Sequence, residues 1–261
     1  MSEENAPIEY HDGPAIPKKG DKGLVSAWRI SFVGAIAILI YLVVTKPDPY
    51  ADLLMFLPDG ILVTFKVTIY SMVLALCFGF IAGLGRISRN YWINLIASTY
   101  VEVVRGVPLL VQLFYLYYAM GQFLRVDGIP AAVIAMSVCY GAYMAEIFRA
   151  GIKSINKGQT EAARSLGFNR TQTMMYVILP QAWRIILPPI GNEFIMLLKD
   201  SSLISILGIA DLLRRGREFA STTFLYFDTY TMVALVYLLI TLVLSKLVST
   251  MEERLSRHVK A

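Results

Sequence analysis

The chain has 261 residues, of which 56% are hydrophobic and 16% are charged, and its formal net charge at pH 7 is +5. A soluble domain carries about a quarter charged residues, so this composition argues against one large soluble core of buried helices. Charge-free runs close to the length that crosses a hydrocarbon core instead predict an all-α, polytopic membrane protein. These runs are residues 30–45, 67–85, 106–124, 128–145 and 229–245.

The N-terminal segment, residues 1–23, is polar, contains three prolines and lacks the early apolar stretch of a cleavable signal peptide. We expect it to be a disordered cytoplasmic tail. Six spans are predicted after it, near residues 28–45, 60–86, 98–124, 130–150, 181–199 and 226–248.

The distribution of cations predicts that both termini lie in the cytoplasm, because Lys and Arg are enriched in cytoplasmic loops. With six spans, one side collects Lys18, Lys19, Lys22, Arg29, Arg86, Arg89, Arg149, Lys153, Lys157, Arg164, Arg170, Lys246, Arg254, Arg257 and Lys260. Three arginines break the pattern, since this topology places Arg214, Arg215 and Arg217 outside. We expect their segment to pack on the protein.

Small residues and prolines mark special points in the spans. Gly79 and Gly83 form a G-x-x-x-G face suited to close helix contact. Pro108 predicts a break in the third span, and Pro180, Pro188 and Pro189 predict a break in the fifth. The prolines of residues 46–49 predict a non-helical connection after the first span. Two broken spans that carry charge suggest a polar pathway between them.

A short amphipathic helix is predicted in the cytoplasm, after the fourth span. Thr160 can cap its start, and Glu161 in the first turn suits the helix dipole. Ala162, Ala163 and Leu166 share an apolar side, and Gly167 is placed to end the helix. An ordinary helical loop is the alternative interpretation.

These residues carry a resemblance to a known family. Glu161-Ala162-Ala163, then Gly167, then nine residues and "VILP" resemble the E-A-A loop of permease subunits in bacterial ABC importers. The stretches "EVVRGVPLLVQLFYL", "GAYMAEIFRAGIKSINKGQTEAARSLGF" and "LPPIGNEFIMLLKDSSL" are similar to the histidine and glutamine permease group, which imports polar amino acids. The similarity extends from about residue 60 to the C-terminus.

The resemblance implies a type I ABC importer permease fold with about six transmembrane helices and a cytoplasmic coupling helix. Residues 59–261 would form the permease core, with the E-A-A loop at about 154–180. Residues 24–58 would add an N-terminal transmembrane helix and an outer loop that the shortest members lack.

The resemblance also implies partners. The short helix would dock on an ABC ATPase pair through Thr160, Glu161, Ala162, Ala163, Arg164, Leu166, Gly167 and Phe168. The chain has no G-x-x-x-x-G-K phosphate loop, so it is expected to be a permease and not an enzyme, with no cofactor of its own. ATP and Mg would be bound by the ATPase. A second permease subunit, identical or related, and an external solute-binding protein would complete the assembly in the bacterial cytoplasmic (inner) membrane, surrounded by lipid and without nucleic acid.

Glu193 and Asp200 are the candidate substrate residues in the fifth span. They lie seven residues apart, on nearly one helical face, and could accept hydrogen bonds from the α-ammonium group of a polar amino acid. Met196 and Leu197 lie between them, on or beside that face, and could form an apolar wall for the side chain. The resemblance agrees with these four residues and places Val107 and Leu110 opposite. Many family members have threonine at the position of Val107. Alternatively, Glu193 bonds Asn192 or nearby backbone and no stable pocket exists.

Two further charge pairs are expected near the spans. Glu102 and Arg105 lie about one turn apart and could pair, although Arg105 could instead help to shape the pathway. Glu146 and Arg149 are expected to form a structural ion pair that anchors the following loop.

Other functions fit the sequence less well. A secondary amino acid transporter or channel without an ATPase partner would also show broken spans, but an internal repeat is expected there and is not found. A membrane enzyme is disfavoured because the only histidines, His11 and His258, lie in the terminal tails. Cys77 and Cys139 lie in apolar runs, which predicts neither a disulfide nor a metal site.

Overall fold

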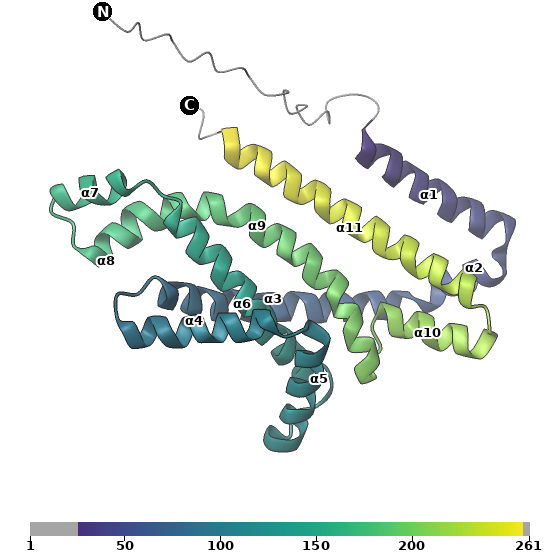
Figure 1. The fold of residues 1–261 in the computed structure, drawn as a ribbon. Coiled ribbons are helices and arrows are strands. Elements are labelled where there is room, and N and C mark those ends of the chain that lie inside the picture. The colour runs from purple at the N-terminus through teal and green to yellow at the C-terminus, as the bar shows by residue number, and fades with distance from the viewer. Residues whose placement is uncertain (1–25, 258–261) are drawn as a thin grey trace, which may run out of the picture.

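The computed structural model describes residues 26–257, and this part of the chain is built from helices without strands (Figure 1). The predicted tail at residues 1–23 lies outside the described residues. The elements are α1 (Ala27–Thr45), α2 (Pro47–Phe56), α3 (Pro58–Arg86), α4 (Tyr91–Gly106), α5 (Leu109–Ala119), the π-helical η1 (Met120–Leu124), α6 (Gly128–Lys153), α7 (Lys157–Ser165), α8 (Arg170–Gln172), the π-helical η2 (Thr173–Ile178), α9 (Leu179–Asp200), the 3-10 helix η3 (Ser201–Leu207), α10 (Leu212–Thr223) and α11 (Tyr226–Arg257).

Four of these helices, α1, α3, α6 and α11, are long and apolar enough to cross a membrane. The pair α4 and α5–η1 forms a fifth apolar unit, but it is bent by 112°. The predicted fifth span corresponds to α9, which rises about 33 Å at 1.5 Å per residue. That length reaches across a bilayer, yet its charged residues keep α9 below the hydropathy of a simple span. The all-helical membrane class is confirmed.

The helices α3 and α6 form the centre of the molecule and pack along their length through small residues. Gly79 lies against Met144, and a Cβ atom at Gly83 would lie only 2.9 Å from the Cβ atom of Phe148. The predicted close contact at Gly79 and Gly83 is therefore confirmed, and it is a contact within the chain. The main core forms around this contact and reaches Ile186 of α9.

The predicted break at Pro188 and Pro189 is wrong. Both prolines lie inside α9, which continues from Leu179 to Asp200, while Pro180 occupies the first turn. Proline removes the hydrogen bond to the carbonyl four residues earlier, so the affected carbonyls are those of Arg184 and Ile185. Both residues lie at the surface of the chain and outside its core.

The first span and the segment after it pack beside the C-terminal helix (Figure 1). The indole N–H of Trp28 donates to the carbonyl of Leu242 at 2.8 Å, and the hydroxyl of Tyr50 donates to the Asp228 carboxylate at 2.7 Å. The predicted non-helical connection is limited to Lys46 and Asp48, because Pro47 begins helix α2. Tyr50 and Leu53 of α2 are buried in a second core cluster.

The three arginines that break the charge pattern lie on helix α10, which packs on the rest of the chain. Its apolar face, with Leu212, is buried against α3 and α11. On the other face, Arg214 pairs with Glu218 at 3.1 Å, and Arg215 contacts Glu218 at 3.5 Å and Asp59 at 3.8 Å. The prediction that this segment packs on the protein is confirmed.

Candidate functional site

The break between α4 and α5 is the most irregular point of the apolar region. The residue before the proline, Val107, has an extended backbone (φ −105°, ψ 137°), as expected because the proline ring disfavours a helical conformation there. The helix restarts at Leu109 in a direction that differs by 112°. The predicted break at Pro108 is confirmed.

A buried amide compensates for the hydrogen bonds lost at this break. Pro108 has no N–H to donate to the carbonyl of Val104, and the carbonyl of Val107 lies at the end of α4. The Nε2 atom of Gln112 donates to both carbonyls at 2.6 Å. The Oε1 atom of Gln112 in turn accepts from the thiol of Cys139 on α6 at 3.2 Å. Gln112 therefore satisfies the broken helix and ties it to α6.

Gln112 was not predicted as a functional residue. The available signal was an amide in an apolar run, four residues after a proline and so about one turn into the helix that restarts there.

A cluster of charges lies just before the break and joins three helices. Glu146 of α6 accepts hydrogen bonds from Arg86 of α3 and from Arg149 at 2.6 and 2.9 Å. Arg105, in the last turn of α4, forms an ion pair with the same glutamate at 3.5 Å. One carboxylate thus holds three guanidinium groups. The predicted pair of Glu146 and Arg149 is confirmed.

The expected pair of Glu102 and Arg105 is not found in the described residues. The two side chains leave one helix toward different partners: Arg105 to Glu146, and Glu102 to Arg86 at 3.5 Å. The side chain of Glu102 is 75% exposed, so its ion pair contributes little stability.

The two acidic residues of α9 lie near this cluster, since Glu193 interacts electrostatically with Arg105. The hydroxyl of Tyr140 on α6 donates to the Asp200 carboxylate at 2.7 Å. Glu193 is half-buried, interacts electrostatically with Asp200 and Arg105, and forms no hydrogen bond within residues 26–257. The guanidinium of Arg105 also lies 5.9 Å from the ring centroid of Tyr143. The predicted alternative, in which Glu193 bonds Asn192, is not seen in this part of the chain.

The structure separates the remaining candidate substrate residues. Met196 is 46% exposed beside Glu193, whereas Leu197 is fully buried in the main core. Val107 lines an apolar cavity of about 310 Å³ formed by α4, α5 and α6, and Leu110 is half-buried. No residue of α9 lines that cavity. Leu197 lies about 100° around the helix from Met196, so the two side chains do not share one exposed surface.

Tyr140 is a second residue that sequence reasoning missed. Its contact with Asp200 joins positions 60 residues apart. Spacing within one helix carries no information about such a contact.

The predicted cytoplasmic helix is α7, which begins earlier than expected. Asn156, not Thr160, caps its start, with the Asn156 side chain accepting from the N–H of Gly158 at 2.8 Å. Thr160 lies inside the helix, because the cap at Asn156 adds most of a turn of backbone hydrogen bonds. Glu161 therefore lies beyond the first turn.

The end of α7 is as predicted. Gly167 has φ +88°, a left-handed conformation that favours glycine. The N–H of Gly167 donates to Arg164 and the N–H of Phe168 donates to Ala163, which together make a Schellman motif.

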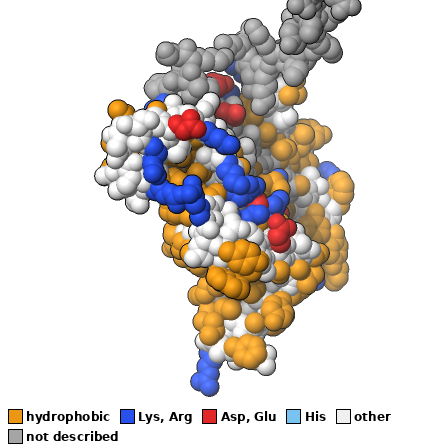
Figure 2. Space-filling view, turned by 60° about the vertical axis from the view of Figure 1, so that its left-hand side comes forward, with side chains coloured by type: hydrophobic (Ala, Val, Ile, Leu, Met, Phe, Trp, Pro, Cys, Tyr) orange, Lys and Arg blue, Asp and Glu red, His pale blue; other side chains and the backbone are white. Residues whose placement is uncertain are grey.

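The predicted docking residues lie on α7 and the turn after it. Ala163 is buried against the protein, with 3% of its surface exposed, and so lies away from any docking face. The other predicted residues are exposed, namely Thr160, Glu161, Ala162, Arg164, Leu166, Gly167 and Phe168. Lys and Arg side chains gather on this end of the molecule (Figure 2).

A nearly unbroken helical path leads from α7 to the acidic residues. After Phe168, Asn169 forms a capping box with Gln172 and starts the path α8–η2–α9. The side chain of Gln181 on α9 donates to Gln159 of α7 at 3.1 Å. Glu193 and Asp200 lie at the far end of this path, so a displacement of α7 is connected to them through helical backbone.

Comparisons with known proteins agree with these features. Residues 75–261 match the family described as "Binding-protein-dependent transport system inner membrane component". The glutamine transport system permease protein GlnP of Escherichia coli is 39% identical over 200 residues, which cover 76% of this chain and 91% of that protein. The L-cystine transport system permease protein TcyB of Bacillus subtilis is 40% identical over 205 residues, covering 78% and 88%.

Solved structures resemble the chain as well. An amino acid ABC transporter with histidines has a TM-score of 0.73 and 41% sequence identity, and the match covers 80% of this chain and 97% of that chain. A chain of the MetNI methionine ABC transporter, in an inward-facing conformation, has a TM-score of 0.69 at 19% identity and supports the fold alone.

Proposed function

The chain belongs to the family of binding-protein-dependent transport system inner membrane components, and on this premise we propose how it couples ATP hydrolysis to amino acid movement. It has the type I ABC importer permease fold and is a multi-pass permease subunit of an ATP-driven importer of polar amino acids. A secondary transporter or channel is not supported. The observation that carries the coupling proposal is the helical path from α7 to Glu193 and Asp200.

In this proposal, α7 docks on a cytoplasmic ABC ATPase that binds ATP and Mg. The exposed side chains of Glu161, Leu166 and Phe168 would provide most of the contact, with Thr160, Ala162, Arg164 and Gly167 around them. Ala163 holds α7 against the permease instead. The Schellman motif and the Gln181 to Gln159 hydrogen bond support a stiff connection, since both ends of α7 are bonded to the segments around it.

We further propose that Glu193 and Asp200 receive the α-ammonium group of the substrate. Two carboxylates on one side of α9 can accept its three N–H donors, and exposed Met196 offers an adjacent apolar contact. Tyr140 would hold Asp200 in position through its 2.7 Å hydrogen bond. Val107 and Leu110 would face the substrate only if α4 and α9 approach each other during transport, and Leu197 would support Met196 from behind.

Two permease subunits, identical or related, would enclose one pathway, and both termini would lie in the cytoplasm. An external binding protein would deliver substrate to the opposite side, near residues 211–218. In that segment, Asp211 is buried and caps α10, so exposed Arg217 is the better candidate for contact with a partner. Closure of the ATPase pair would move both copies of α7 together and change access to the pathway.

The substrate proposal is tested by Glu193→Gln in the complete transporter reconstituted in vesicles. The expected result is loss of uptake with normal assembly and ATP binding, because a neutral amide accepts the ammonium group less strongly than a carboxylate. Lys199→Gln is the control, since Lys199 is exposed on the same helix. This variant is expected to keep normal uptake. Normal uptake by Glu193→Gln would exclude the carboxylate from the substrate site.

The docking proposal is tested by co-purification of the ATPase with the permease. Gly167→Val places a β-branched residue at φ +88°, so the turn after α7 should deform and the ATPase should be lost. Ser165→Ala keeps the backbone of α7 and serves as the control. An ATPase that stays bound to Gly167→Val as it does to the unchanged chain would contradict docking at this turn.

A further inference from the structure

A cationic cavity of about 460 Å³ lies between the α3–α4 turn, α7 and the start of α8–η2. Arg89, Arg164 and Arg170 line it, together with the polar side chains of Ser88, Asn90 and Thr160. Neither Asp nor Glu is among the lining residues. The cavity therefore offers hydrogen-bond donors and positive charge from three separate segments of the chain.

These three arginines differ from the three that share Glu146. Within residues 26–257, no carboxylate lies within ion-pair distance of Arg89, Arg164 or Arg170. Like charges that converge on one cavity repel each other, so an anion between them lowers the energy. Guanidinium groups suit phosphate oxygens in particular, because their planar N–H donors match the geometry of the phosphate.

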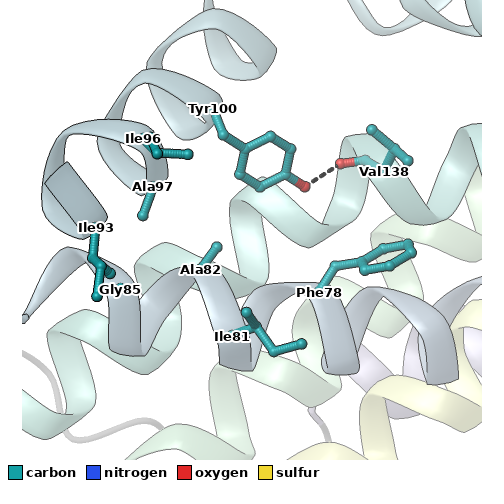
Figure 3. Close-up of a pocket in the computed structure, with 9 residues that line it drawn as sticks. All are labelled: Phe78, Ile81, Ala82, Gly85, Ile93, Ile96, Ala97, Tyr100 and Val138. Carbon is teal, nitrogen blue, oxygen red and sulfur yellow. Dashed lines mark hydrogen bonds between the residues drawn. The ribbon is translucent and has the colours of Figure 1, made fainter.

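An apolar groove begins beside this cavity and runs between α3 and α4 (Figure 3). It has a volume of about 430 Å³ and extends from Gly85 and Ile93 to Phe78 and Tyr100. The hydroxyl of Tyr100 donates to the carbonyl of Val138 at 2.6 Å, so its polar atom is already satisfied. The groove is thus suited to a hydrocarbon chain.

The cavity and the groove are adjacent along both helices. Gly85 of the groove is two residues from Ile87 of the cavity, and Ile93 of the groove is three residues from Asn90 of the cavity. A ligand with an anionic group joined to an apolar chain would fit the two sites together.

The turn between the two sites also carries residue types that are typical of the membrane–water interface. Tyr91 and Trp92 begin α4, their ring centroids lie 5.3 Å apart, and each side chain is 68% exposed. Exposed tyrosine and tryptophan are enriched at the level of lipid headgroups. A lipid phosphate at this level is therefore favoured over a carboxylate from a protein partner deeper in the cytoplasm.

We propose that the chain binds an anionic phospholipid on the α7 side of the membrane, with its phosphate among Arg89, Arg164 and Arg170 and an acyl chain in the α3–α4 groove. The headgroup would link the α3–α4 turn to α7. The site does not depend on the substrate residues of α9, but it shares Thr160 and Arg164 with the proposed ATPase contact.

Native mass spectrometry of the full chain in mild detergent tests the proposal, with phosphatidylglycerol and zwitterionic phosphatidylcholine added in equal amounts. The unchanged chain should retain phosphatidylglycerol preferentially. Arg89→Gln combined with Arg170→Gln should reduce that retention by about thirtyfold, since each removed arginine near the membrane surface weakens anionic lipid binding. The control is Arg125→Gln, an exposed arginine that follows η1 at the other end of the α5 segment.

Two additional variants separate the parts of the site. Arg89→Lys keeps the positive charge and should retain more lipid than Arg89→Gln, which distinguishes a charge effect from misfolding. Ala82→Leu fills the groove and should weaken retention of phosphatidylglycerol without changing the effect of inorganic phosphate on the unfolding temperature.

Four outcomes would overturn the proposal. The first two are equal retention of both lipids by the unchanged chain and unchanged phosphatidylglycerol retention by the double arginine variant. The third is stabilisation by inorganic phosphate while Ala82→Leu leaves lipid retention unchanged. The fourth is a double arginine variant that retains phosphatidylglycerol normally but no longer co-purifies with the ATPase. The third would indicate a free phosphate site, and the fourth would indicate that an acidic side chain of the ATPase fills the cavity. Loss of transport in a Glu193 variant leaves the lipid measurement unaffected, so the two proposals fail separately.

Discussion

Two proline-containing segments of this chain behave in opposite ways. Pro108 ends α4 and redirects the chain by 112°, whereas Pro188 and Pro189 lie within a continuous α9. The difference lies in the carbonyls that lose their donor. Within residues 26–257 no side chain donates to the α9 carbonyls of Arg184 and Ile185, whereas at the break the carbonyls of Val104 and Val107 both accept from the buried side chain of Gln112. In this chain, the proline that breaks its helix is thus the one with a side chain placed to donate to the freed carbonyls.

The largest effect is expected from Glu146→Gln, which removes the charge that anchors the end of α4 beside the break. Three arginines would lose their shared carboxylate, and the expected cost of about 3 kcal/mol comes mainly from Arg86, whose side chain is 12% exposed, because an unpaired charge with little exposure is strongly unfavourable. A clear decrease in the thermal unfolding temperature of the purified chain is expected. Glu102→Gln, at an exposed ion pair, is the control, and an equal decrease in both variants would contradict the assignment.

A somewhat smaller effect is expected from Gln112→Leu, which acts directly on the break. The carbonyls of Val104 and Val107 would lose their donors, with an expected destabilisation of about 2 kcal/mol. The measurement is the unfolding temperature together with amino acid uptake by the reconstituted transporter. Gln122→Leu, an exposed glutamine on η1, should change neither quantity, and a matching loss in that control would show a general effect of added apolar surface.

Pro108→Ala should alter transport more than stability. Alanine is about 3 kcal/mol better than proline within a helix, so α4 is favoured to continue through the break. A several-fold decrease in uptake is expected, with expression and unfolding temperature close to those of the unchanged chain. Normal uptake would show that the bend does not depend on the proline.

The smallest effect is expected from Pro188→Ala, because α9 is already helical there. The new N–H can donate to the carbonyl of Arg184, so the unfolding temperature should stay the same or rise. Uptake should be preserved. A loss of uptake comparable to that of Pro108→Ala would mean that the two proline segments contribute to transport in the same way.

The elements that the sequence predicted well are those with a strong local signal. Charge-free runs located α1, α3, α6 and α11, and the positive φ of Gly167 followed from its position after an apolar helical face. The start of α7 was placed at Thr160 instead of Asn156 because both residues are good caps, and only the backbone geometry selects one.

The contacts that sequence could not provide are those between distant segments. Arg86 and Glu146 are 60 residues apart, as are Tyr140 and Asp200, and their meeting depends on how α3, α6 and α9 are aligned. Short helices outside the apolar runs, α2 and α10, were also missed as helices, because each becomes amphipathic only relative to the surface on which it packs.

The length of the helical path from Arg170 to Asp200 sets the size of the motions that it can transmit. Its segments of 3, 6 and 22 residues rise about 45 Å at about 1.5 Å per residue. Rotation by about 10° around the Asp200 end would displace the Arg170 end by about 8 Å, which exceeds the helical pitch of about 5.4 Å. A large swing at the Arg170 end thus becomes a small angular change at Glu193. The π-helical turn η2 lies near the swinging tip, so its bending stiffness sets how much of that swing becomes rotation at the carboxylates.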